Sequence, residues 1–200
     1  GGSDTASSQW LTSRGAEKNL ITTVNYPALT VPLEPAIWFN RSFVSINRYQ
    51  LMQDLFSIKG KVALVTGGSR GIGEMIAAGF LAHGAKVYIS SRKADVCDAT
   101  AKRLMAQFGG ECISMPANLA EVDSIQAFAN DLASRESQLD ILVNNAGVSW
   151  GASLDDFPEV GWDKVMDTNV KGVFFLTQKL LPLLRTSGNA EDPARVINIG

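Results

Sequence analysis

The sequence has few of the residues that metal, redox and hydrolytic sites need. It contains one histidine, His83, and two cysteines, Cys97 and Cys112. The cysteines form no Cys-x-x-Cys pair, so we interpret them as idle or buried thiols in a reducing compartment and predict no metal site. His83 precedes Gly84 at the end of a predicted helix, where an imidazole interacts well with the helix dipole. A single histidine in that place makes a Ser-His-Asp hydrolase a poor fit.

The chain also lacks a strong charge of one sign and a long hydrophobic run. Its net charge is −2, and no block of basic residues occurs. Electrostatic capture of nucleic acid or of an anionic membrane is therefore not indicated. Polar residues interrupt every apolar stretch before it reaches the length that crosses a bilayer. With 200 residues, 46% of them hydrophobic, the chain is long enough for one globular domain with a sizeable core.

Short apolar runs alternate with helical patterns from residue 61 onward. Strands are predicted over residues 61–66, 87–90, 112–115, 139–144 and 196–199, and helices over 71–83, 95–108, 121–137 and 159–184. Strands that are apolar on both faces and alternate with helices indicate a parallel sheet covered on each side. We therefore predict an α/β fold of the Rossmann-like, doubly wound type. The expected strand order is 3-2-1-4-5, with a ligand site at the carboxyl ends of the first and fourth strands.

Residues 1–53 have a different character from the rest of the chain. They contain Pro27, Pro32 and Pro35, many serines and threonines, and no sustained periodicity. We interpret them as a poorly ordered or loosely packed extension that precedes a domain over residues 54–200. They are a weak candidate for a targeting segment. The expected location is therefore cytoplasmic, or mitochondrial if this segment directs import.

The glycine-rich stretch from Thr66 to Gly73 is the most informative motif. It follows the first predicted strand and opens into the first predicted helix, and its glycines are spaced G-x-x-x-G-x-G at Gly67, Gly71 and Gly73. Such a turn brings a helix N-terminus and free N–H groups close to a phosphate. The absence of Gly-Lys-Ser/Thr disfavours a triphosphate P-loop. The alternative is a plain turn that needs positive φ angles.

A second motif, Asn144-Asn145-Ala146-Gly147, follows the fourth predicted strand. Both motifs therefore fall at the same edge of the predicted sheet, at its switch point. Taken alone, the second motif is also compatible with a simple turn that closes a strand. Two motifs that converge on one crevice favour a nucleotide site more strongly than either does alone.

Together these motifs resemble the classical short-chain dehydrogenase/reductase family. The resemblance extends over about residues 54–200, and it rests on Thr66-Gly67, Gly71-Ile72-Gly73, Asn118-Leu119, residues 144–147 and Asn169-Val170. Residues 55–61 and 148–152 are similar to the subgroup of 3-oxoacyl-carrier-protein reductases of the rhamnolipid type. A glycine loop with three residues between the first glycines argues against a sugar epimerase on the same fold.

The resemblance implies a nicotinamide cofactor across the carboxyl edge of the sheet. It places one group of residues at the phosphates and the adenosine ribose, a second at the adenine and a third at the nicotinamide-side ribose. The implied cofactor-binding residues are Gly67, Ser69, Arg70, Gly71, Ile72, Gly73, Ser91, Arg92, Asn118, Leu119, Asn145, Ala146 and Gly147. Asn118 replaces the aspartate usual in the family, but its amide can still meet the adenine amino group.

The end of the second strand predicts which cofactor is preferred. An acid there would bind a ribose 2′-hydroxyl and repel a 2′-phosphate. The strand instead ends in Ser90-Ser91-Arg92-Lys93, without an acid. Arg92 can form two charge-assisted hydrogen bonds with a phosphate, and Arg70 can approach from the glycine loop. We therefore predict NADP(H) rather than NAD(H), the alternative being two solvated surface arginines.

The residues that perform the reaction are mostly outside the sequence. By resemblance, the family reduces a ketone by hydride transfer, with a Tyr as proton donor, a Lys that lowers its pKa, a Ser at the carbonyl oxygen and an Asn that anchors a water. Of these, Asn169 alone is present, and the alternative interpretation is that it caps or bends a long helix. None of Tyr26, Tyr49 and Tyr88 has a lysine four residues later.

Two interpretations of the whole chain follow. In the first it is part of a reductase that acts on a ketone or alcohol, an acyl thioester being one candidate, and is inactive alone. In the second it is a catalytically dead NADP-binding or interaction protein. The apolar strand 196–199 would end as a bare sheet edge, which favours the first. Excess apolar surface on helix 159–184 predicts a homodimer or homotetramer. Trp150 and Phe157 either line a substrate pocket or cover a helix start.

Overall fold

The computed structural model describes residues 56–200, which follow the predicted alternation of strands and helices. The elements are β1 (Val62–Thr66), α2 (Gly71–Ala82), β2 (Lys86–Ser90), α3 (Ala94–Phe108), β3 (Cys112–Ser114), α4 (Val122–Arg135), β4 (Ile141–Asn144), α5 (Glu159–Met166), the π-helical turn η1 (Asp167–Lys171), α6 (Gly172–Ser187) and β5 (Arg195–Asn198). The predicted extension over residues 1–53 and its possible targeting role lie outside the described residues. So does the predicted start of the domain at residue 54.

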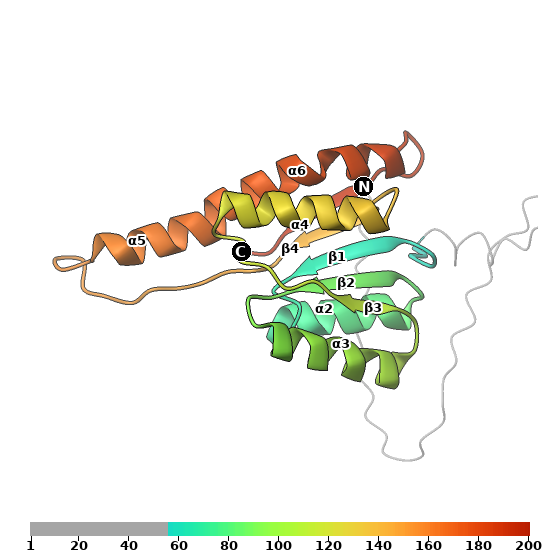
Figure 1. Ribbon diagram of the computed structural model, residues 1–200, viewed down its shortest axis with the longest axis horizontal. Helices are drawn as coiled ribbons and strands as arrows, with labels where there is room; N and C mark the ends of the chain where they lie inside the picture. The colour runs from blue at the N-terminus through green and yellow to red at the C-terminus, as the bar shows by residue number, and fades with distance from the viewer. Residues whose placement is uncertain (1–55) are drawn as a thin grey trace, which may run out of the picture. The chain divides into compact units, whose positions relative to one another are not determined.

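The five strands form one parallel sheet in the order β3-β2-β1-β4-β5, as predicted. Helices α4 and α6 cover one face and α2 and α3 the other (Figure 1). The core is accordingly split in two, because successive side chains of a strand point to opposite faces. Leu64 packs with α4 and α6, whereas its neighbour Val65 packs with α2 and α3. This sandwich places the ends of β1 and β4 side by side, with Val65 paired to Val143.

The long helix predicted over residues 159–184 is interrupted. A π-helical turn separates α5 from α6, and the Gly172 N–H donates to the carbonyl oxygen of Asp167. At Gly172 the helix approaches the loop between β3 and α4 so closely that a Cβ atom would lie 2.2 Å from the carbonyl oxygen of Leu119. The missing side chain permits this approach. Periodicity in the sequence cannot reveal it, because the apolar pattern continues through the turn.

Polar contacts at the amino edge of the sheet fix the path of the chain into β5. The carboxylate of Asp140, which is 1% exposed, accepts hydrogen bonds from Val62 N (2.8 Å), Ser187 Oγ (2.6 Å) and Lys61 Nζ (3.2 Å). Lys61 also pairs with Asp192, which precedes β5. Burial raises the pKa of Asp140, but the bonds from Ser187, Val62 and Lys61 outweigh it, so the pKa lies below its usual value.

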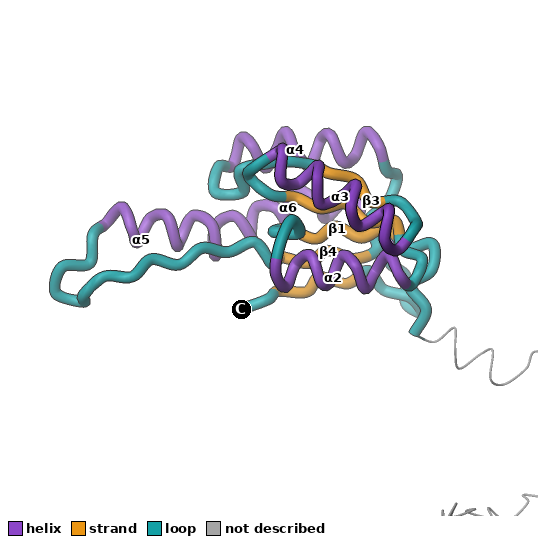
Figure 2. Tube along the Cα trace, turned by 90° about the horizontal axis from the view of Figure 1, so that it is seen from below, coloured by secondary structure: helices purple, strands orange, loops and turns teal. Residues whose placement is uncertain are grey.

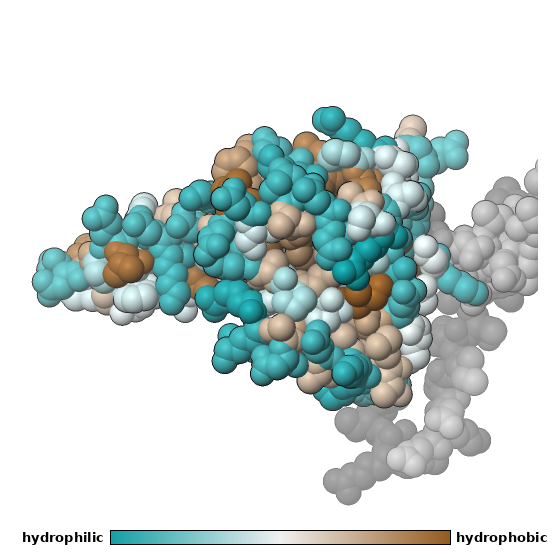
Figure 3. Space-filling model, in the orientation of Figure 1, coloured by the Kyte–Doolittle hydropathy of each residue, from teal (hydrophilic) through white to brown (hydrophobic). Residues whose placement is uncertain are grey.

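Helix α5 and the loop before it project beyond the sheet (Figures 1 and 2). The Trp150 ring lies against Gly161 in the first turn of α5, with Lys164 Nζ 5.1 Å from the ring centroid. This contact favours the reading in which Trp150 covers a helix start. We call helix α5 and the loop before it the arm. Several of its apolar side chains are exposed, among them Leu154 (91%) and Trp162 (60%). Figure 3 shows apolar surface on the arm.

Candidate functional site

The turn between β1 and α2 has the geometry of a phosphate-binding loop. Gly67 and Gly71 have φ angles of +65° and +58°, in the left-handed region that favours glycine. The chain passes from the buried strand through Arg70 into the first turn of α2. A helix N-terminus carries unpaired N–H groups and the positive end of the helix dipole. This turn can therefore bind an anion such as a pyrophosphate.

Thr66 joins this turn to the loop after β4. Its Oγ1 accepts hydrogen bonds from Asn145 N and Ala146 N, both at 2.9 Å, and donates to Val143 O at 3.2 Å. Asn145 Nδ2 donates to the carbonyl oxygen of Thr66 at 2.9 Å. The sequence motif predicts that the two loops meet, but it does not reveal that Thr66 holds them together. The sequence signal that could have indicated this role is a polar residue, threonine, at the last buried position of β1.

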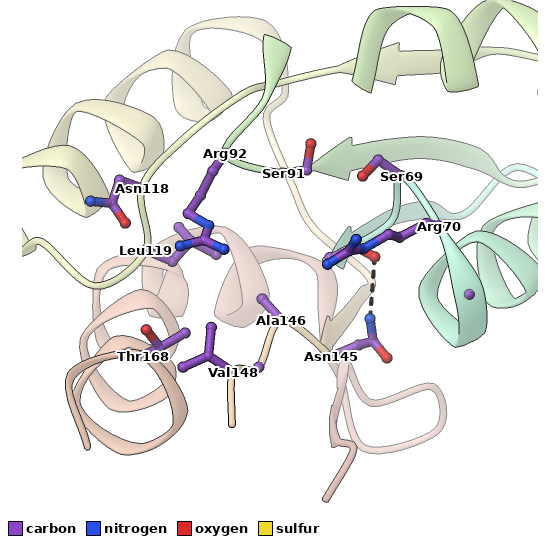
Figure 4. Close-up of a pocket in the computed structure, with 13 residues that line it drawn as sticks. Ser69, Arg70, Ser91, Arg92, Asn118, Leu119, Asn145, Ala146, Val148 and Thr168 are labelled. Carbon is purple, nitrogen blue, oxygen red and sulfur yellow. Dashed lines mark hydrogen bonds between the residues drawn. The ribbon is translucent and has the colours of Figure 1, made fainter. Parts of the chain in front are cut away.

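The two loops border a cavity of about 350 Å³ at the carboxyl edge of the sheet. Its walls come from the ends of β1, β2, β3 and β4 and from the π turn (Figure 4). The lining residues are Gly67, Ser69, Arg70, Gly71, Ser91, Arg92, Asn118, Leu119, Asn145, Ala146, Gly147, Val148 and Thr168. The structure thus brings together every predicted cofactor residue except Ile72 and Gly73. Val148 and Thr168 were not predicted, although each is adjacent in sequence to a predicted residue.

Ile72 and Gly73 are not among the residues that line this cavity, and their surroundings differ. The Ile72 side chain is 57% exposed in the first turn of α2. Gly73 is buried, and a Cβ atom there would lie 2.4 Å from the carbonyl oxygen of Gly67 and 2.5 Å from Asn145 Nδ2. Gly73 therefore lets the helix pack against its own glycine loop. Direct contact of either residue with a cofactor stays a prediction.

Asn169 lies in the π turn, and its side chain binds the loop after β4. Its Oδ1 accepts from Val148 N and its Nδ2 donates to Val148 O, both at 2.9 Å. The oxygen and the nitrogen of the amide thus each bind a backbone group of the same residue, Val148. In this arrangement the side chain positions Val148 in the cavity wall. The predicted role of Asn169 in anchoring a catalytic water stays a prediction.

Positive charge gathers on one side of the cavity. The guanidinium groups of Arg70 and Arg92 point into it from the glycine loop and from the end of β2 (Figure 4). An adjoining cavity of about 460 Å³ is lined by Ser69, Arg70, Ser91, Arg92, Lys93 and Val96. Within residues 56–200, no carboxylate forms a salt bridge with Arg70, Arg92 or Lys93. Lys93 is a cation that the sequence prediction left out of the site.

The Asn118 side chain is oriented by its own loop. Its Nδ2 donates to Glu121 Oε1 at 2.6 Å, and its Oδ1 accepts from Ala120 N at 3.3 Å. An adenine amino group is a donor and would therefore meet the acceptor Oδ1, whose one bond from the described residues is long. The predicted contact requires only an acceptor at this position.

A second cavity, of about 660 Å³, adjoins the loop after β4. Ser149, Asn169, Asn198 and Gly200 are among the residues that line it. Tyr88, the one tyrosine in the described range, does not line this cavity. Its ring is buried in the core, and its hydroxyl donates to Glu136 Oε1 at 2.6 Å. Burial, together with that bond to Glu136, raises the pKa of Tyr88 to about 12. Tyr88 is therefore unsuited to act as a general acid.

The described residues contain neither a candidate metal site nor a candidate membrane span. No cluster of three His, Cys, Asp or Glu side chains is arranged to hold a metal ion between residues 56 and 200. No helix in that range combines the length and the apolarity that a bilayer span requires. Cys97 and Cys112 are both free and buried, as predicted.

A doubly wound sheet with a glycine turn and an anion site at its switch point defines a nucleotide-binding α/β domain. The sequence profile of the short chain dehydrogenase family matches residues 61–200. The chain is 54% identical over 149 residues to the rhamnolipids biosynthesis 3-oxoacyl-[acyl-carrier-protein] reductase of Pseudomonas aeruginosa, covering 74% of this chain and 57% of that protein. The chain therefore belongs to the short-chain dehydrogenase family.

Solved structures agree with this assignment. The RhlG/NADP active-site complex of Pseudomonas aeruginosa is similar with a TM-score of 0.70 and 54% identity, over 72% of this chain and 56% of that one. A metagenomic short-chain oxidoreductase in complex with NADP has a TM-score of 0.65 and 35% identity, over 72% of this chain and 63% of that one. The present chain thus spans little more than half the length of these relatives.

Proposed function

We propose that this chain binds NADP(H) in the cavity at the carboxyl edge of the sheet. The observation that carries the proposal is the pair of arginines, Arg70 and Arg92, which face the cavity without a competing acid. A ribose 2′-phosphate beside them would gain charge-assisted hydrogen bonds, whereas a free 2′-hydroxyl would leave the two cations without an anionic partner. NADP in two similar solved structures supports the same cofactor.

The activity proposed for the whole protein is that of an NADP(H)-dependent carbonyl reductase or alcohol dehydrogenase. The cofactor supplies the hydride. The cavity beside Ser149 and Asn169 is the proposed place for a ketone, and the name of the Pseudomonas relative favours a 3-oxoacyl compound, with an acyl thioester as the candidate to test. We expect the 200-residue chain to bind cofactor without turnover, because no tyrosine in the described range is placed to donate a proton.

The preference for the phosphorylated cofactor is tested by Arg92→Ala. A hydrogen bond to a charged group contributes about 1.5–3 kcal/mol, so NADP⁺ affinity should fall by roughly 10–150-fold. NAD⁺ affinity should change little. The matched control is Arg185→Ala, which removes an exposed arginine at the end of α6, away from the cavity. The affinities of both variants for both cofactors are measured by isothermal titration calorimetry. If Arg92→Ala leaves the ratio of the NADP⁺ and NAD⁺ affinities unchanged, the proposed preference is overturned.

A second candidate function is a catalytically dead NADP-binding or interaction protein. It is favoured by the exposed apolar side chains of Met166, Val170 and Phe174, which recur every four residues on α5, η1 and α6. The same surface supports assembly into a homodimer or homotetramer. NADPH oxidation with a 3-oxoacyl thioester mimic is the assay: turnover by the 200-residue chain would exclude the dead protein and would also contradict the expectation that this chain is inactive alone. Sedimentation tests whether the chain forms a homodimer or homotetramer.

The cytoplasmic location, and the alternative mitochondrial location, also stay predictions.

A further inference from the structure

One buried amide at the end of β4 has an oxygen without a protein partner. Asn144 is 3% exposed, and its Nδ2 donates to Thr177 Oγ1 at 3.1 Å and to Asn198 Oδ1 at 2.9 Å. Its Oδ1 receives no hydrogen bond from any described residue. A buried carbonyl oxygen without a donor is costly, and in folded proteins such atoms are usually satisfied by ordered water.

A small cavity lies against Asn144. Its volume is about 10 Å³, close to the lower limit for one water molecule. It lies between the ends of β1 and β4, the loop after β3 and the face of the helix that follows the π turn. The lining residues are Thr66, Leu119, Asn144, Ala146, Thr168, Gly172, Val173 and Leu176. One of them, Gly172, is the point where the backbone of α6 approaches the Leu119 carbonyl closely.

Two residues with hydroxyl side chains, Thr66 and Thr168, line this cavity. They differ in how many further hydrogen bonds their hydroxyls can form. Thr66 Oγ1 already donates to Val143 O and accepts two backbone N–H groups, so it has no capacity left. The Thr168 side chain makes no hydrogen bond with the described residues, and it also lines the proposed cofactor cavity. Asn144 and Thr168 thus bring an acceptor and a free hydroxyl to the lining of a cavity with the volume of about one water molecule.

We propose that a single buried water occupies this cavity, donates a hydrogen bond to Asn144 Oδ1 and bonds to the Thr168 hydroxyl. The water then links the sheet to the π turn and holds Thr168 in the wall of the larger cavity. This site is independent of the proposed reaction, because none of its contacts involves a cofactor or a substrate. The amide orientation supports it, since Thr177 Oγ1 donates to Val173 O and so offers Asn144 a lone pair.

The test is a crystal structure of the full chain at a resolution that shows ordered water. The expected result is one isolated density peak about 2.8 Å from Asn144 Oδ1 and within the same reach of Thr168 Oγ1. An empty cavity, or an amide whose NH₂ group faces the cavity, overturns the proposal.

Two variants at position 168 test the bridge itself. Thr168→Val keeps the side-chain shape and removes the hydroxyl, so the water peak should weaken or vanish. Thr168→Ser keeps the hydroxyl and should retain the peak. Equal water occupancy in both variants refutes the bridge to Thr168. If Thr168→Val does not fold, the wild-type structure and Thr168→Ser still decide, because loss of the water in Thr168→Ser contradicts a hydroxyl-held site.

Discussion

Replacing Gly172 by alanine tests whether the contact between α6 and the loop after β3 shapes the cofactor cavity. A Cβ atom at this position lies 2.2 Å from the Leu119 carbonyl oxygen and 3.1 Å from that of Asp167. Both are backbone atoms, so no side-chain rotation relieves the overlap. The helix and the loop must therefore move apart by about 1 Å to reach an ordinary contact distance.

The expected cost follows from two opposing terms. Overpacking of this kind destabilises by about 1–3 kcal/mol, and the better helix propensity of alanine returns about 0.5–1 kcal/mol. For a domain of this size, a net loss of up to about 2.5 kcal/mol lowers the melting temperature by up to about 10 °C. Because Leu119 lines the cofactor cavity, NADPH affinity should fall as well.

Gly79→Ala is the matched control. Gly79 lies in the middle of α2, exposed, with no atom within 4 Å of a built Cβ. The same substitution should therefore stabilise the protein by about 0.5–1 kcal/mol and leave NADPH binding unchanged. Circular dichroism melts and cofactor titrations of both variants provide the comparison. A Gly172→Ala protein that melts at or above the wild-type temperature and binds NADPH equally well would refute the close contact.

The remaining predictions concern stability and the two loops. Since the folded-state pKa of Asp140 is lowered, its stabilising effect is present at neutral pH and is lost as the pH falls below about 4. Asp140→Asn should melt at a lower temperature at pH 7 and show a flatter acid dependence; parallel pH profiles would contradict this. Asn169→Ala removes two hydrogen bonds to Val148, which costs about 1–3 kcal/mol in total and speeds amide exchange at residues 147–149. Unchanged exchange there argues against the positioning role. Gly73→Ala should weaken NADPH binding by distorting the glycine loop, and undiminished affinity would count against its packing role.

Much of the architecture could be predicted because each strand and helix has a local signature. Fully apolar runs such as 62–65 predict buried parallel strands, and glycines after Thr66 mark the turn. The strand order then follows from the handedness of the crossovers. Nearly all of the cavity lining followed as well, because carboxyl ends of neighbouring parallel strands meet at one edge.

The features that were not predicted depend on contacts between distant residues. The hydrogen bonds of Thr66 to the loop after β4 span about eighty positions of sequence. The π turn depends on the approach of Gly172 to Leu119, and the orientation of Asn169 depends on Val148. A hydrophobic period reports which face of a helix is buried, but not how closely its backbone approaches another loop.

The central claim is that the chain binds NADP(H) at the carboxyl edge of its sheet. The most direct measurement is a titration of the purified 200-residue chain with NADPH and with NADH, followed by intrinsic fluorescence or calorimetry. We predict saturable binding of NADPH that is at least about tenfold tighter than that of NADH, since two arginines line the cavity where the 2′-phosphate is proposed to bind. Equal affinities, tighter binding of NADH, or no binding of either by the folded chain would contradict the account.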